Sequence, residues 1–130
     1  METSVIFERF WNRFSTENPH AKRIFDLFTA RGEKVVHDHI ALRTFDDPRM
    51  NIDVISRLFT ENGYEARGNY EFKAKKLRGM HFEHKSDPDA PKVFISELLE
   101  QSATITEIQP VEFTEGVHKI PSCFYEFTLR

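Results

Sequence analysis

The residues best suited to chemistry lie in the segment His-Asp-His-Ile-Ala-Leu-Arg, positions 37–43. Even numbers of positions separate His37, His39 and Arg43, so in a strand their side chains leave the same face. His39 and Arg43 would stand about 13 Å apart along the strand, at roughly 3.3 Å per residue. An imidazole can ligate a metal, and a guanidinium can hold a carboxylate through paired hydrogen bonds. The spacing suits a dicarboxylate of about five or six carbons with one end at the metal. In the structural alternative, the imidazoles are surface groups and Arg43 pairs with an aspartate at 46 or 47 or with a neighbouring strand.

Two carboxylates occur in apolar segments and need partners. Glu126 lies among aromatic residues in Pro-Ser-Cys-Phe-Tyr-Glu-Phe, where an unpaired carboxylate would be costly to bury. A metal would satisfy it, and so would an arginine such as Arg43 or Arg78. Glu97 shares a predicted strand face with apolar residues, so it is a metal ligand, an acceptor behind a ligand or an ion-pair partner. The residues alone leave these alternatives open.

His81 and His84 add two further imidazoles in Gly-Met-His-Phe-Glu-His. Their odd separation places them on opposite faces of a strand, so at most one of them shares a site with His39. No glycine-rich phosphate loop, paired-cysteine zinc pattern or HExxH motif occurs, which leaves nucleotide, structural-zinc and zincin functions without support.

The elements that must position these residues are read from hydrophobic periodicity. Apolar residues recur at helical spacing near 5–15, 19–31 and 51–62, and glycines at 32 and 63 end the second and third helices. Strands are predicted over 35–45, 64–72, 76–84 and 92–99, with further strands near 103–113 and 122–129. We therefore expect one α+β domain over 1–130. It has a helical segment over 1–32, a βαβββ module over 35–99 and C-terminal strands over 103–130.

Composition excludes several classes of partner. Eighteen basic and 21 acidic side chains give a net charge of −3, which offers no basis for phosphate-driven binding to nucleic acid. No apolar run is long enough to span a bilayer, and the N-terminal segment mixes charges with apolar residues, unlike a signal peptide. The single cysteine, Cys123, suits a reducing compartment. We expect a cytoplasmic protein with no nucleic-acid or membrane partner.

Four segments in order resemble the DUF1338 family, whose characterised members are 2-oxoadipate dioxygenase/decarboxylases, also called 2-hydroxyglutarate synthases. They are Val-His-Asp-His-Ile-Ala-Leu-Arg-Thr-Phe, Asn-Tyr-Glu-Phe-Lys-Ala-Lys-Lys-Leu-Arg-Gly, Val-Phe-Ile-Ser-Glu-Leu and Ile-Pro-Ser-Cys-Phe-Tyr-Glu-Phe. The family looks like a branch of the vicinal-oxygen-chelate superfamily. The resemblance thus implies a βαβββ module whose curled mixed or antiparallel sheet lines a metal site, with the N-terminal helices added to it.

The resemblance implies a mononuclear Fe(II) centre held by two histidines and one glutamate, with open positions for a 2-oxo acid and O₂. His39 and Glu126 fall on the metal-ligand positions, and Arg43 falls on the position of the arginine that contacts the substrate carboxylate during catalysis. The implied reaction converts 2-oxoadipate into 2-hydroxyglutarate and CO₂, a step in lysine breakdown. Another divalent metal in the same site is a further alternative.

The chain also departs from the family. Members for comparison are about twice as long, and their central region supplies the second histidine, which has no aligned counterpart here. His81, His84, His37 or a partner chain would have to substitute, and a homodimer is expected to cover the open sheet edges. The alternatives to an oxygenase are a catalytically incomplete carboxylate- or metal-binding module and a glyoxalase-like isomerase or lyase.

Overall fold

The computed structural model describes residues 2–99, 110–114, 118–121 and 124–129, and the last three segments are described by their backbone alone. In chain order the elements are α1 (Thr3–Glu17), α2 (Pro19–Ala30), β1 (His37–Phe45), α3 (Ile52–Thr60), β2 (Tyr64–Phe72), a short 3-10 helix (Lys73–Lys75), β3 (Leu77–His84), β4 (Lys92–Leu98), β5 (Pro110–Thr114), β6 (His118–Pro121) and β7 (Phe124–Leu129). The run from β1 to β4 confirms the predicted βαβββ module and the α+β class. Most of the strand expected over 103–113 lies outside the described residues.

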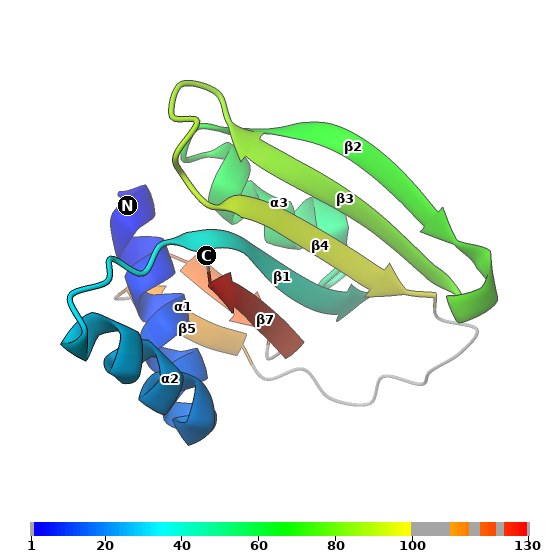
Figure 1. Cartoon of the computed structure of the whole chain (residues 1–130). Coiled ribbons are helices and arrows are strands. Elements are labelled where there is room, and N and C mark those ends of the chain that lie inside the picture. The colour runs from blue at the N-terminus through cyan, green and yellow to red at the C-terminus, as the bar shows by residue number, and fades with distance from the viewer. Residues whose placement is uncertain (1, 100–109, 115–117, 122–123, 130) are drawn as a thin grey trace.

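One mixed, curled sheet carries the module, in the strand order β2-β3-β4-β1-β7 (Figure 1). β1 pairs with β4 in parallel and with β7 in antiparallel register, whereas β2, β3 and β4 are antiparallel neighbours. β5 and β6 form a separate two-stranded sheet. β1 therefore lies inside the sheet, between a strand of the module and the last described strand of the chain.

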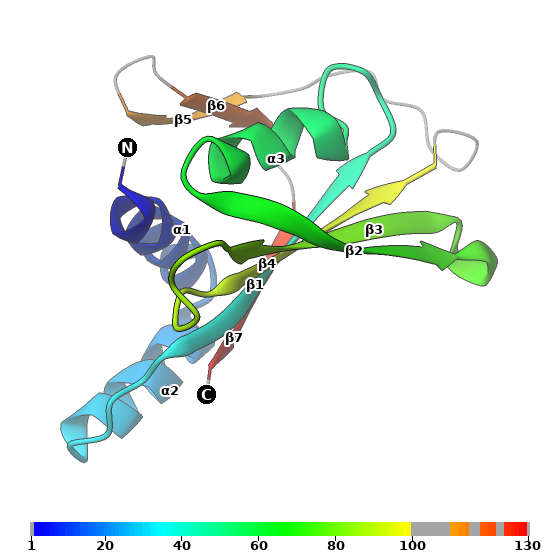
Figure 2. The same ribbon diagram turned by 90° about the horizontal axis from the view of Figure 1, so that it is seen from above.

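The hydrophobic core lies between one face of this sheet and the helices α1 and α3 (Figure 2). The Asn51 side chain caps α3 by accepting a hydrogen bond from the Val54 amide at 3.1 Å. Gly63, at a φ of +92°, reverses the chain between α3 and β2. The buried cluster consists of Ile6, Phe10, Ile40, Leu42, Ile52, Ile55, Leu58, Phe59, Tyr64, Phe82, Val93 and Ile95.

The other face of the sheet is not covered by any of the described helices and is the face toward the viewer in Figure 1. Along β1, the side chains of this face are half-buried or exposed and alternate with the buried side chains of the core face. We call this the open face. Within the described residues, no helix is both long and apolar enough to cross a bilayer.

Candidate functional site

β1 divides its side chains between the two faces of the sheet, as the sequence predicts. Ile40, Leu42 and Thr44 are buried on the core side. His39 and Arg43 alternate with them and belong to the open face, which confirms that these two residues share a face. The guanidinium of Arg43 is exposed, and its Nε lies 3.4 Å from Ser96 Oγ on the neighbouring strand, a long hydrogen bond.

His37 does not join them, so the prediction that it shares a face with His39 is wrong. The pairing of β1 with β7 is irregular between His37 and His39, and this irregularity breaks the two-residue alternation on which the prediction depended. The His37 ring instead packs edge-on against Trp11, with ring centroids 5.0 Å apart, and lies near Phe25. This burial lowers the pKa of His37 below its usual 6.5. His37 therefore belongs to the contact between β1 and the N-terminal helices.

His39 lies beside a carboxylate. Asp38 Oδ2 is 3.1 Å from His39 Nδ1, and both side chains are partly exposed. An acceptor at Nδ1 favours the tautomer that carries its proton there, so Nε2 is the nitrogen left with a lone pair. Histidine ligands of metals are commonly oriented by a carboxylate in this way.

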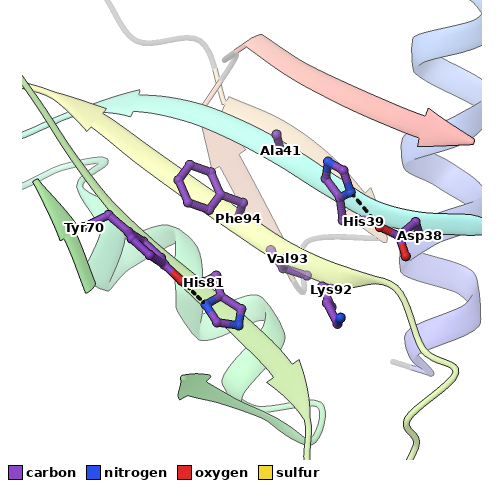
Figure 3. Close-up of a pocket in the computed structure, with 8 residues that line it drawn as sticks. All are labelled: Asp38, His39, Ala41, Tyr70, His81, Lys92, Val93 and Phe94. Atoms are coloured by element: carbon purple, nitrogen blue, oxygen red, sulfur yellow. Dashed lines mark hydrogen bonds and ion pairs between the residues drawn. The ribbon is translucent and has the colours of Figure 1, made fainter. Parts of the chain in front are cut away.

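His39 lines a pocket of about 270 Å³ on the open face (Figure 3). The pocket lies over β4, and side chains from β1, β2, β3 and β4 surround it. Its lining residues are Asp38, His39, Ala41, Tyr70, His81, Lys92, Val93 and Phe94. Arg43 is not among these lining residues and lies further along β1.

Of the three substitute histidines, His81 is the one that lines the same pocket as His39. Its Nδ1 lies 3.0 Å from the Tyr70 hydroxyl. The His84 ring packs edge-on against the buried ring of Tyr64, with centroids 5.2 Å apart, so it belongs to the core side. The prediction that His81 and His84 leave opposite faces of the strand is confirmed.

Glu126 is placed here by backbone register alone, because its side chain lies outside the described part. In β7 it pairs with Ala41 of β1, between the register positions of His39 and Arg43. Ala41 in turn pairs with Phe94, and Phe94 pairs with His81. Backbone register thus puts His81, Phe94, Ala41 and Glu126 in one row across the sheet.

Glu97 is an ion-pair partner on the core side of the sheet. The sequence alone had left its role open between a metal ligand, an acceptor behind a ligand and an ion-pair partner. The Glu97 side chain is 6% exposed. Glu97 Oε2 accepts a hydrogen bond from the Ile52 amide in the first turn of α3 at 3.0 Å. Glu97 Oε1 lies 2.9 Å from Arg78 Nε, an ion-pair distance whose angles do not make a hydrogen bond. The carboxylate therefore joins β3, β4 and the positive end of the α3 dipole.

The described side chains do not by themselves form a complete metal site. Among them, no three histidine, cysteine, aspartate or glutamate side chains are close enough together to hold one ion. The pocket also contains Tyr70, Lys92 and Phe94, which were not predicted from the sequence. Lys92 pairs with His39 in parallel register, and this pairing cannot be read from either strand alone.

Comparison with known proteins identifies relatives of known name. The model of the family described as 2-oxoadipate dioxygenase/decarboxylase matches residues 7–127. The chloroplastic/amyloplastic 2-oxoadipate dioxygenase/decarboxylase of Oryza sativa is 34% identical over 96 residues, which cover 66% of this chain and 26% of the rice protein. The chain thus spans about a quarter of the length of that relative.

Solved structures of several proteins resemble this fold. The hydroxyglutarate synthase of Oryza sativa, solved in complex with 2-oxoadipate, has a TM-score of 0.71, with 31% identity over 78% of this chain and 36% of that one. A protein of the glyoxalase superfamily from Ralstonia eutropha has a TM-score of 0.59 and 27% identity, covering 66% of this chain and 29% of that one. Both likenesses support the predicted fold class. The chain belongs to the 2-oxoadipate dioxygenase/decarboxylase family.

Proposed function

We propose that this chain supplies a metal-binding and substrate-binding part of a dioxygenase that decarboxylates a 2-oxo dicarboxylate. The proposed reaction is 2-oxoadipate plus O₂ to 2-hydroxyglutarate plus CO₂, which balances in carbon, hydrogen and oxygen. The observation that carries the proposal is the placement of His39 and Arg43 on one open strand face, in a family whose rice member was solved with 2-oxoadipate. A role in lysine breakdown and a cytoplasmic location are parts of the same proposal.

We infer that His39 is a ligand of a metal of the Fe(II) class. Asp38 favours the His39 tautomer with its lone pair on Nε2, the form that a metal requires. In the proposal, Glu126 is the second ligand, because its register position falls beside Ala41 on the strand next to His39. A second copy of the chain would supply the third ligand, since a site with two histidines and one carboxylate needs another imidazole. When bound, Fe(II) would supply the activation of O₂ and of the 2-oxo acid.

Arg43 is proposed to bind the substrate carboxylate that lies away from the metal. Its guanidinium is exposed on the open face, and its one described hydrogen bond, to Ser96, is long. A carboxylate could therefore replace this contact with two shorter, charge-assisted hydrogen bonds. Arg43 would orient the substrate so that its 2-oxo end points along β1 toward His39.

A second candidate function is dicarboxylate binding without turnover. It is favoured by the exposed Arg43 on the open face, which could hold a carboxylate without any oxygen being consumed. The glyoxalase-like alternative would use a divalent metal without O₂.

The test combines metal analysis with oxygen and CO₂ measurements. The protein is loaded with Fe(II) under anaerobic conditions, and oxygen uptake and CO₂ release are then measured with 2-oxoadipate. Equal amounts of O₂ consumed and CO₂ released, lost in His39→Ala, would support the dioxygenase. Tight dicarboxylate binding with no oxygen uptake would support the binding module instead. Absence of both metal binding and dicarboxylate binding would refute the proposal.

A further inference from the structure

The aromatic rings of Tyr70 and Phe94 line the pocket together with His81 (Figure 3), and two glycines lie close to these rings. The Tyr70 and Phe94 ring centroids are 5.8 Å apart, and the Tyr70 hydroxyl is hydrogen-bonded to His81 Nδ1. A Cβ at Gly68 would lie 2.7 Å from the Tyr70 hydroxyl and 2.8 Å from His81 Nδ1. A Cβ at Gly79 would lie 2.8 Å from the Phe94 ring. Any side chain at these positions would displace these rings, so both glycines make room for them.

The side chains of His81 and Lys92 lie on either side of the Glu83 carboxylate at the edge of this pocket. His81 Nε2 is 3.4 Å from Glu83 Oε2, and Lys92 Nζ is 3.9 Å from Glu83 Oε1. Both contacts are long, and the Lys92 side chain is 49% exposed. Partly exposed pairs at such distances contribute little to stability. Glu83 therefore occupies a position between two nitrogen donors without being held there firmly.

The same edge lies next to the proposed metal ligand. Lys92 pairs with His39 in the parallel register of β4 and β1, and both line the pocket with His81. Phe94 follows two residues after Lys92 on the same face, in the direction of Ser96 and Arg43. A ligand with a carboxylate at Lys92 would thus place its hydrocarbon chain over the Phe94 ring on the way toward Arg43.

We propose that Lys92 and His81 hold one carboxylate of a short dicarboxylate at the His39 end of the pocket, in place of the Glu83 carboxylate that they contact in this structure. The Phe94 and Tyr70 rings support the hydrocarbon chain of the ligand, and the Tyr70 hydroxyl orients His81. The ligand class rests on the proposed function, whereas the binding position rests on the pocket alone. Glu83 then competes with the ligand, so its removal strengthens binding.

The test measures binding of adipate to metal-free protein by calorimetry. Adipate has two carboxylates and no 2-oxo group, so neither metal nor turnover is needed. Lys92→Met is expected to weaken adipate binding about 2- to 5-fold, the loss of one partly exposed charge contact. Glu83→Gln is expected to strengthen it about 2- to 5-fold, because the competing negative charge is gone. Lys34→Met, which changes an exposed lysine between α2 and β1 that lines neither this pocket nor the one beside Glu83, is the matched control and should bind as the unmodified chain does.

The outcome for Glu83→Gln separates a binding role of Lys92 and His81 from a structural one. If their contacts with Glu83 were only structural, breaking these contacts would not increase the affinity for adipate. Unchanged or weaker adipate binding in Glu83→Gln, or equal weakening by Lys34→Met and Lys92→Met, would overturn the inference. So would a failure of the unmodified chain to bind adipate. Oxygen uptake with 2-oxoadipate is measured separately in the Fe(II)-loaded protein. Adipate binding that depends on Lys92 without oxygen uptake would leave this inference standing and refute the dioxygenase.

Discussion

Replacing Glu97 by glutamine tests whether this carboxylate is structural. Glutamine keeps the shape and can still accept the Ile52 amide hydrogen bond, but it loses the charge that faces Arg78 and the α3 N-terminus. A charge-assisted hydrogen bond contributes about 1.5–3 kcal/mol, and breaking a fully buried ion pair costs about 3–5 kcal/mol. The Arg78 side chain is 41% exposed, so water can solvate it after the change. We therefore expect Glu97→Gln to lower the free energy of unfolding by about 2 kcal/mol.

Urea unfolding followed by circular dichroism measures this loss, and a fall in Tm of roughly 6–10 °C should accompany it. Glu65→Gln is the control, because its ion pair with Arg67 is exposed on both sides and should change the free energy of unfolding by less than about 0.5 kcal/mol. Equal effects of the two changes would refute the structural role of Glu97. A loss of bound Fe(II) at unchanged stability would make Glu97 a metal ligand instead.

Three further predictions concern the open face and the N-terminal helices. Asp38→Asn should weaken Fe(II) binding about 10-fold in a metal titration, because it removes the carboxylate at His39 Nδ1; unchanged affinity would contradict this orienting role. Arg43→Ala should raise the KM for 2-oxoadipate at least about 10-fold and leave the Fe(II) content unchanged, since a bidentate charge contact is lost; unfolding would instead make Arg43 a structural residue. The neutral form of His37 is favoured by folding, so the stability it contributes is complete above pH 6.5 and falls as the pH drops through its lowered pKa. His37→Phe should therefore reduce the loss of unfolding free energy between pH 7.5 and pH 5, measured by urea unfolding at each pH.

Much of the module was predictable because its elements have clear periodicity. The β2 strand matches its predicted bounds, and the alternation of Ile40 and Leu42 with His39 and Arg43 fixes the two faces of β1. These features depend on neighbours in sequence, where the side-chain period is a direct consequence of strand geometry.

The rest depended on contacts between distant segments. The irregularity beside His37 arises from pairing with β7, some ninety positions away, and no local pattern indicates it. The proximity of Lys92 to His39 follows from a parallel pairing across the whole of α3, β2 and β3. The role of Glu97 could be recognised only once the position of α3 relative to β4 was known, because its carboxylate accepts a hydrogen bond from the first turn of α3. The one local signal that could have pointed to the pocket was a pair of glycines inside predicted strands, which often mark a close approach of neighbouring groups.

Because β1 lies inside the sheet and β2 at its edge, the two sides of the pocket differ in how easily their strands open. Hydrogen bonds to β4 and β7 hold both edges of β1, so the segment with His39 and Arg43 can open only when a neighbouring strand separates. β2, which carries Tyr70, is an outer strand and can fray by losing β3 alone. Amide hydrogens of β1 should accordingly exchange with solvent more slowly than those of β2. A ligand that enters the pocket would therefore contact a rigid strand at His39 and a more mobile strand at Tyr70.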